Sequence, residues 1–293
     1  MKFFLRFIIF CSIFLLTASP ILKHVDFKKA MYKNVCKELK GDVLLYFIFI
    51  DTKETSPWTD FDIRSTLDSI SIAAKWISEQ ANKNHIQLTL KTNYYIGKPY
   101  ATVTKNLPNG SVKNTVYEPS VKKGMIALND WADDIAKKVG TTFNLNPKDG
   151  IPEVKTLRTK ERLIAYLRDE YNVESVALVF MVNNYYRVDI SVAVNTFSTD
   201  DVEFAIVSYK YPSEISHNIL GLFGAAPLFK SVYRKSDSKI EYANKLLPND
   251  AMQDPYAKNI YKLEIGPLTS YLIGWTTHLS KEYEKLLIDG IAF

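Results

Sequence analysis

Residues 43–50 form an unbroken run of apolar side chains, and this run limits the folds open to the chain more than any other feature. Such a run suits a β-strand that is covered on both faces, as in a sheet with helices on either side. An amphipathic helix is expected to begin at Asp60, and residues 86–95 alternate as a half-buried strand. The chain therefore opens as strand, helix and strand, which predicts an α/β layer.

Further periodic segments predict the elements that follow. Helices are expected over residues 127–139, 157–171 and 212–224, and strands over residues 176–182, 188–194 and 202–207. Asn109-Gly110 indicates a turn, either in a hairpin or in a long surface loop over residues 97–120. Residues 266–287 carry Leu268, Leu272, Trp275 and Leu286 on one face, which predicts a long amphipathic helix that closes the chain.

Together these elements predict an α/β (α+β) protein. The expected upper lobe, a mixed sheet with helices, covers residues 20–225, and a smaller, mostly helical part covers residues 226–293. With 293 residues, of which 47% are apolar, the chain is long enough to bury a sizeable core.

The N-terminus resembles an export signal. Lys2 and Arg6 supply positive charge, residues 7–16 are apolar, and residues 17–19 are small. The apolar run is shorter than the roughly 20 residues of a membrane-spanning helix. We therefore expect a signal peptide over residues 1–19 and a periplasmic or secreted protein. The alternative is an uncleaved leader that anchors the chain in the membrane.

The charge pattern excludes several classes of partner. The formal charge is only +5, and acidic and basic residues are interspersed throughout the chain. We expect no nucleic-acid partner, and membrane contact only through the N-terminal segment, because neither a basic stripe nor a polybasic patch is present. The chain also has no G-x-S-x-G nucleophile elbow and no phosphate-binding glycine loop.

One segment suggests a specific chemistry: the stretch from Glu214 to Pro227 reads EISHNILGLFGAAP. It places His217 on a helix that ends at Gly224, and Met252 follows in an irregular region. This order resembles the zincin metallopeptidases, in particular the metzincin-like branch with the pattern HExxHxxGxxD or HExxHxxGxxH. In that family the helical histidines and a third residue bind Zn²⁺, and the glutamate acts as general base.

The resemblance assigns a role to each position of the segment, which reads HNxxGxxGxxP here. His217 matches the first zinc ligand, Asn218 the general base, Gly221 the second ligand, and Pro227 the third ligand. Gly224 matches the glycine at which the chain turns, and Met252 matches the methionine turn beneath the metal. Gly224 and Met252 are thus expected to be structural.

The departures from the family pattern predict a loss of catalysis. Asn218 cannot accept a proton from a metal-bound water, and Gly221 and Pro227 offer no side-chain ligand. One imidazole does not hold zinc, because zinc sites need three or four protein donors. We therefore expect an exported pseudo-metallopeptidase without catalytic residues or cofactor. It is expected to bind an extended peptide or protein in the retained cleft, by pairing with the strand at 202–207.

Two alternatives remain open from the sequence. An active metal-dependent hydrolase would rebuild its site from His217, Glu214 and acids such as Asp250 or Asp254, since Glu-x-x-His spacing also occurs in carboxylate-bridged metal sites. His217 would then be a ligand rather than a helix histidine bonded to a neighbour. The other alternative is an unrelated α/β structural protein, which would have no cleft beside the helix at 211–224.

Overall fold

The computed structural model describes residues 24–31, 35–36, 38–97, 103–112, 121–141, 159–183, 190–197, 201–208 and 210–290. The expected signal peptide over residues 1–19 lies outside these ranges. Within them, no helix combines the length and the apolar character that a membrane span requires.

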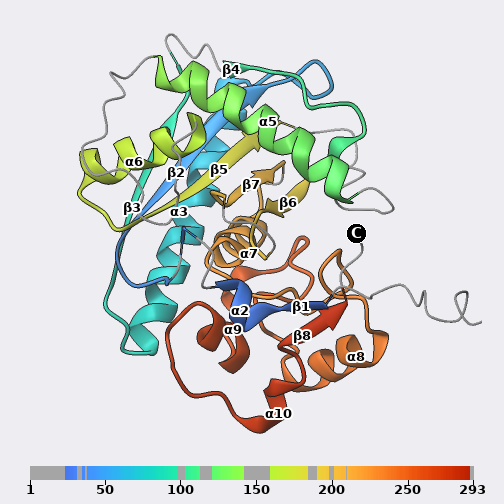
Figure 1. Cartoon of the computed structure of the whole chain (residues 1–293). Helices are drawn as coiled ribbons and strands as arrows, with labels where there is room; N and C mark the ends of the chain where they lie inside the picture. Colours follow the sequence, from blue (N-terminus) through green and yellow to red (C-terminus); the bar gives the residue numbers. More distant parts are fainter. Residues whose placement is uncertain are drawn as a thin grey trace, which may run out of the picture.

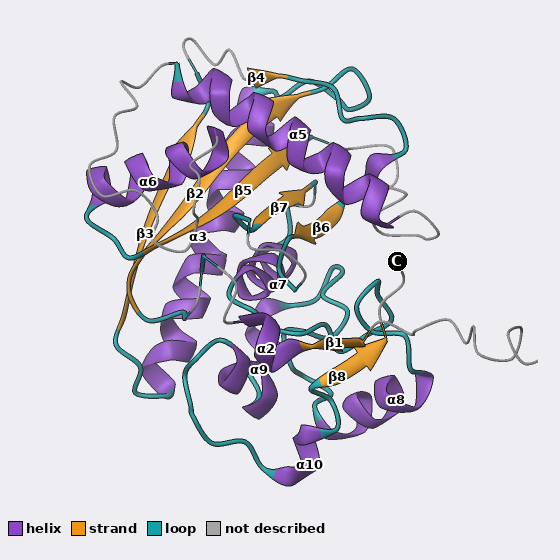
Figure 2. Cartoon of the chain, viewed as in Figure 1, coloured by secondary structure: helices purple, strands orange, loops and turns teal. Residues whose placement is uncertain are grey.

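A mixed six-stranded sheet forms the upper half of the molecule (Figures 1 and 2). Its order is β3 (Leu88–Tyr95), β2 (Gly41–Asp51), β5 (Ser175–Val182), β7 (Phe204–Val207) and β6 (Ser191–Val194), and the short β4 (Val103–Thr104) also pairs with β2. All pairs are parallel except β6 with β7. The predicted α/β (α+β) class is confirmed.

The strands β2 and β5 lie in the middle of the sheet, and their residues are almost all apolar. Every residue of β2 from Val43 to Ile50 is buried, and so is every residue of β5. Helices cover both faces: α3 (Asp60–Lys83) and α7 (Pro212–Leu222) pack together on one face, and α5 (Val121–Gly140) and α6 (Thr159–Tyr171) on the other (Figure 1). A strand in this position must be apolar throughout, as the sequence predicts.

The predicted start of α3 is confirmed by its cap. The Thr59 hydroxyl accepts a hydrogen bond from the Asp62 N–H at 3.2 Å, and the Asp62 carboxylate accepts one from the Thr59 N–H. This capping box satisfies N–H groups that the first turn of a helix leaves without partners. The Asn109-Gly110 turn is present as well, with Gly110 at a φ of 72°. In the described part of that loop, β4 runs parallel to β2, so it does not form a hairpin with it.

The predicted closing helix over 266–287 is wrong. The segment contains the short helices α9 (Pro267–Leu272) and α10 (Lys281–Glu284), and it ends in the strand β8 (Ile288–Gly290). Gly274 causes the break: its φ is +83°, and a Cβ there would lie 2.7 Å from Cγ of Glu38. The next residue, Trp275, donates its indole N–H to the Leu39 carbonyl at 2.7 Å. The apolar side chains of this segment are therefore buried by a chain that bends at Gly274, and not by one continuous helix.

The lower half is less helical and less continuous in sequence than expected. It contains α8 (Asp237–Leu246), the 3-10 helix η1 (Ile260–Lys262) and a two-stranded antiparallel sheet of β8 with β1 (His24–Asp26). The helix α2 (Phe27–Met31) follows β1 and contacts α9 (Figure 1). Residues 24–31, which the sequence places in the upper lobe, thus belong to the lower half.

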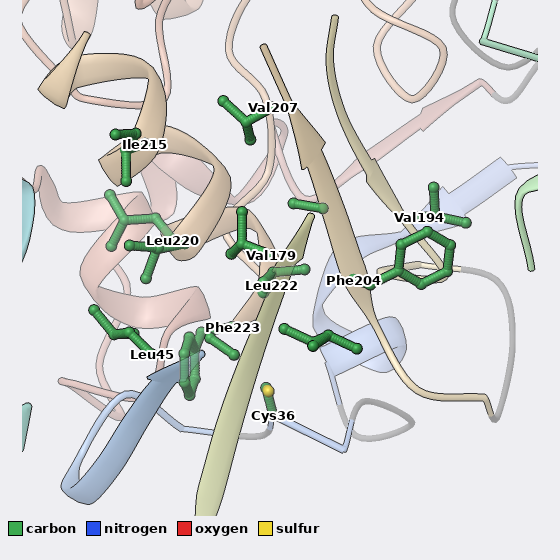
Figure 3. Packing of buried hydrophobic residues seen from close by; sticks show 14 of the residues in the cluster. Cys36, Leu45, Val179, Val194, Phe204, Val207, Ile215, Leu220, Leu222 and Phe223 are labelled. Atoms are coloured by element: carbon green, nitrogen blue, oxygen red, sulfur yellow. The ribbon is translucent and has the colours of Figure 1, made fainter. Parts of the chain in front are cut away.

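One core joins the sheet to α7 (Figure 3). Leu45 and Val179 on the central strands, and Leu220 and Phe223 on or next to α7, are all at most 1% exposed. The buried Cys36 packs among them and donates its thiol to the Val176 carbonyl at 3.2 Å. This packing fixes α7 against the sheet, and with it every side chain that α7 carries.

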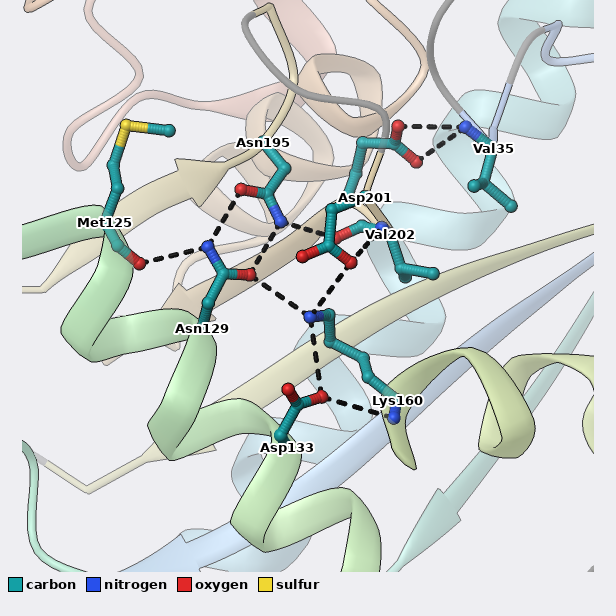
Figure 4. Close-up of polar contacts among 9 residues, drawn as sticks. Val35, Met125, Asn129, Asp133, Lys160, Asn195, Asp201 and Val202 are labelled. Carbon is teal, nitrogen blue, oxygen red and sulfur yellow. Dashed lines mark hydrogen bonds and ion pairs between the residues drawn. The ribbon is translucent and has the colours of Figure 1, made fainter. Parts of the chain in front are cut away.

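A buried polar cluster joins the upper helices to the end of the sheet (Figure 4). The fully buried ammonium of Lys160 lies 3.1 Å from the Asn129 side-chain oxygen, 3.5 Å from the Asp133 carboxylate and 3.2 Å from the Asp201 carboxylate. Close by, the buried Glu203 carboxylate accepts the N–H of Val35 at 2.9 Å. The cluster thereby also holds the segment that leads from the lower half into β2.

Candidate functional site

The helix α7 carries the segment that resembles a zincin active site. Pro212 occupies its first turn, where a missing N–H does no harm, and the helix ends at Leu222. Gly224 follows with a φ of 92°, so the chain reverses at the predicted residue. The predicted helix over 212–224 and its glycine terminator are confirmed.

A pocket of about 1370 Å³ opens beside this helix. His217, Asn218, Gly221, Pro227 and Met252 all line it, together with Glu214. The structure therefore brings together every position that the resemblance assigns to metal, base or methionine turn. A structural protein unrelated to the zincins was expected to have no cleft beside this helix, and a pocket is present there.

The imidazole of His217 is held in one orientation. Its Nδ1 lies 2.9 Å from the carbonyl oxygen of Ala251, and its ring centroid is 5.7 Å from that of Phe229. A carbonyl only accepts, so Nδ1 carries the proton and Nε2 keeps its lone pair. Burial lowers the pKa of His217, which favours the neutral ring. Zinc-binding histidines are commonly oriented by such a bond from the second ring nitrogen to a backbone carbonyl.

Asn218, which the resemblance matches to the general base, is held in place as a hydrogen-bond donor. Its side-chain nitrogen donates to the Ser191 hydroxyl at 2.8 Å and to the Glu214 carbonyl at 2.9 Å. The Ser191 hydroxyl in turn donates to the Glu214 carboxylate at 2.9 Å. Glu214 and Asn218 are each only 3% exposed. The cluster orders the junction of α7 with β6, and Asn218 itself has no group that could take up a proton.

Gly221 and Pro227, which the resemblance matches to the second and third ligands, have no donor atoms in their side chains. A Cβ built on Gly221 would lie 3.8 Å from Cβ of Ala193, an ordinary contact distance. Pro227 accepts a hydrogen bond from the guanidinium of Arg234 through its backbone carbonyl. Arg234 is buried and paired with Asp289 at 3.2 Å. The backbone at Pro227 is thus anchored independently of its side chain.

Met252 lies in a turn next to His217, whose Nδ1 bonds to the carbonyl of the neighbouring Ala251. Met252 is 1% exposed, and its carbonyl accepts the Leu228 N–H at 2.9 Å. The turn depends on Asp250, whose buried carboxylate accepts the N–H of Met252 at 2.8 Å and that of Gly266 at 3.0 Å. The Thr269 hydroxyl also donates to it at 2.9 Å.

Gly266 is required for this arrangement. A Cβ there would lie 2.5 Å from Asp250 Oδ2, so only glycine lets the backbone approach the carboxylate. Burial raises the pKa of Asp250 to about 6. Asp250 is therefore a structural residue that holds a turn, rather than a residue of the pocket wall.

The alternative of a rebuilt metal site finds no support in the described part of the chain. Asp250 is occupied by three donors, and Glu264 pairs with it through a backbone bridge. Asp254 does line the pocket with His217 and Glu214. Even so, no three His, Cys, Asp or Glu side chains among the described residues form a group that could hold a metal.

The predicted pairing of a bound peptide with the strand at 202–207 is wrong. Residues 202–207 correspond to β7, which lies between β5 and β6 and has both edges occupied. The edge strand next to the pocket is β6, and Ser191, Val192 and Ala193 line the pocket. The sequence contains two short strands in succession but no signal for which one lies outermost.

The chain matches no known protein family, no curated protein and no solved structure.

Proposed function

We propose that this chain is a non-catalytic, zincin-like protein that binds an extended peptide, or an extended segment of a protein, in the pocket beside α7. One observation carries the proposal. The positions that correspond to ligands, base and methionine turn in a zincin gather around one large pocket, yet they offer only one metal-binding side chain, His217. A scaffold of this kind keeps a peptide-sized groove after its chemistry has gone.

The backbone of β6 supports an extended ligand. Ser208 donates its N–H to the Ile190 carbonyl at 2.7 Å, so residues 190 and 208 form a hydrogen-bonded pair. Pairs alternate along an antiparallel ladder, and Val192 and Val194 therefore direct their backbone groups toward β7. Ser191 and Ala193 then direct N–H and C=O away from the sheet. A peptide added as a strand would bond to these groups, while residues of α7 and of the segment 225–235 would contact its side chains.

A substitution at the sheet edge tests this proposal. Ala193→Pro removes an outward N–H that the sheet does not use, a position where proline is tolerated. Ala193→Ser is the matched control, because it changes the side chain and keeps the N–H. Purified protein is screened against a library of N-acetylated, C-amidated hexapeptides, with retained peptides identified by mass spectrometry and their Kd measured by fluorescence polarisation.

The expected result has two parts. The unsubstituted protein and Ala193→Ser retain the same peptides uncleaved, and Ala193→Pro weakens their binding at least tenfold. Retention that is equal in all three proteins would contradict pairing along β6. Stoichiometric zinc together with peptide cleavage that a chelator abolishes would overturn the non-catalytic assignment.

A further inference from the structure

We propose that the buried carboxyl cluster around Lys160 regulates peptide binding at β6: the edge strand is firmly held while Glu161 and Glu203 carry protons, and it loosens when they ionise. This inference rests on the proposed peptide binding and adds a regulation of that same site by pH. The cluster is bonded to the residue that follows β6, and it contains more buried carboxyl groups than cations.

A chain of hydrogen bonds connects Lys160 to the end of β6 (Figure 4). The ammonium lies 3.1 Å from the side-chain oxygen of Asn129, which also accepts a hydrogen bond from the Asn195 amide at 2.8 Å. Asn195 directly follows β6, and its side chain also donates to the Val202 carbonyl at 2.8 Å, so it joins the two arms of the β6–β7 pair. Ala193, whose outward backbone groups we propose to pair with the peptide, lies two residues before Asn195.

The start of β7 is held by the same cluster. Asp201 lies 3.2 Å from the Lys160 ammonium. Glu203 directly precedes β7, and its carboxylate accepts the N–H groups of Val35 and Cys36 at 2.9 Å and 3.2 Å. The end of β6 and the start of β7 therefore both lie in the cluster, so that a change of charge within it acts on the edge strand.

The cluster holds more acidic than basic groups. Its two cations both come from α6: Lys160, and Arg168, which donates to the Val35 carbonyl at 3.2 Å. Its carboxyl groups come from α5, from α6 and from the segment before β7, and they are Asp133, Glu161, Asp201 and Glu203. Glu161 is 2% exposed and Glu203 is 0% exposed. Ionisation of every carboxyl group would leave a net negative charge away from water, which is costly.

Two of the carboxyl groups bond to each other. A carboxylate only accepts hydrogen bonds, so the bond between Glu161 and Asp201 requires a proton on one of them. Burial raises the pKa of Glu161 to about 7, and the bond to Asp201 adds to this effect. Burial also raises the pKa of Asp201, but its bonds to Glu161 and Lys160 outweigh this effect and lower it. The shared proton therefore resides on Glu161.

The expected dependence on pH follows from these protons. Burial raises the pKa of Glu203 to about 8, so Glu161 and Glu203 are both neutral below pH 7 and both ionised above pH 8. Their ionisation favours opening of the β6–β7 pair, and a peptide that binds only the ordered edge strand then loses affinity in proportion. His217 in the pocket does not add to this effect, because burial holds its pKa below the usual 6.5.

Calorimetric titration across the pH range tests this inference. One peptide that the library screen retains, N-acetylated, C-amidated and without ionisable side chains, is titrated at pH 6, 7, 8 and 8.5. The variant Glu161→Gln imitates the protonated state, because its amide NH₂ can donate to Asp201 as the carboxyl proton does. Glu203→Gln removes the second ionisation, and if it does not fold, Glu161→Gln alone keeps the test. Glu79→Gln is the control, because this side chain is 43% exposed.

We expect the Kd of the unsubstituted protein and of Glu79→Gln to rise at least fivefold from pH 6 to pH 8.5. Glu161→Gln and Glu203→Gln should each reduce this rise at least twofold. Hydrogen exchange at pH 8.5 should be faster in β6 of the unsubstituted protein than in β6 of Glu161→Gln, and equal in α3. A Kd that does not depend on pH, or a rise that both variants keep, would overturn the inference and leave peptide binding standing. If no peptide binds at any pH, the proposed function fails, and the inference fails with it.

Discussion

The side-chain nitrogen of Asn218 lies 2.8 Å from the hydroxyl oxygen of Ser191, so this residue of α7 is bonded to the edge strand of the sheet. A catalytic glutamate at this position would have to leave its carboxylate free to take a proton from a metal-bound water. Here the side chain instead helps to hold α7 against β6. Asn218 thus forms a packing contact at the residue where the zincin pattern has a glutamate.

Zinc binding should be recoverable by restoring the missing donors. Gly221→His and Pro227→Asp, added to His217, would supply three ligands, and Asn218→Glu would restore the base. A Cβ at residue 221 would meet Cβ of Ala193 at 3.8 Å, an ordinary contact distance, and residue 221 lines the pocket. We expect the triple variant to bind about one equivalent of zinc, measured by atomic emission after dialysis.

The matched control for zinc binding is the same triple variant with His217→Phe added. It should bind zinc at least tenfold more weakly, because only two of the three donors remain. A folded triple variant that takes up no zinc would count against the zincin geometry, provided that its circular dichroism equals that of the unsubstituted protein.

Asp250→Asn should destabilise the protein strongly. The substitution replaces one carboxylate oxygen by an NH₂ group, which cannot accept from Met252 N or Gly266 N. A buried donor left without a partner costs about 1–3 kcal/mol, so the free energy of unfolding should fall by roughly 3 kcal/mol. Urea denaturation measures this loss. Asp254→Asn, on an exposed side chain, should change stability by less than about 0.5 kcal/mol.

The ion pair of Arg234 with Asp289 should contribute far more to the stability of the fold than the ion pair of Lys230 with Asp237. Asp289→Asn removes the carboxylate partner of a guanidinium that is 0% exposed, and breaking such a pair costs about 3–5 kcal/mol. Asp237→Asn breaks a pair whose side chains are 71% and 77% exposed, so we expect a change of about 0–1 kcal/mol. Thermal unfolding of both variants compares the two effects. Equal losses would contradict the buried position of Arg234.

Stability should fall as the pH rises from about 5 to about 8. Burial raises the pKa of Glu203 to about 8 and that of Glu161 to about 7, whereas the unfolded chain releases these protons near pH 4.5. A carboxyl with a raised pKa stabilises the fold fully below its unfolded value, and this contribution is lost as the pH passes its folded value. Asp62, with a pKa lowered to about 2, acts in the opposite sense but below this window.

Urea denaturation at pH 5, 6, 7 and 8 checks the sign of this dependence. Glu203→Gln, which cannot ionise, should make the profile flatter than that of the unsubstituted protein. Glu79→Gln is the control, because this side chain is 43% exposed. A free energy of unfolding that increases across the window, or a Glu203→Gln profile as steep as the original, would contradict the assignment.

The sequence predicted those parts of the fold that depend on local patterns. The buried strand at 43–50, the capped start of α3 and the glycine end of α7 each follow from neighbouring residues. The closing helix was wrong because an apolar spacing of three and four does not reveal that Gly274 breaks the helix. The pairing strand was wrong because the order of β6 and β7 depends on contacts between distant segments.

The same limit applies to the candidate site. The motif identified His217, Asn218, Gly221, Pro227 and Met252, and all of them line one pocket. It could not identify Ser191, because this residue reaches Asn218 from a different element. It also could not show that the Asp250 carboxylate accepts hydrogen bonds from Met252, Gly266 and Thr269, since Gly266 and Thr269 lie well beyond the turn in sequence.

The pairing of β1 with β8 has a consequence for the order in which the protein folds. His24 lies opposite Gly290, so this sheet cannot close until almost the whole described chain has been synthesised. Contacts between residues so distant in sequence slow folding, because the intervening loop must be closed first. The sheet around β2 and β5 can form before that point, whereas the small sheet of the lower half forms only once β8 is present. The lower half would therefore remain open until β8 is available to pair with β1.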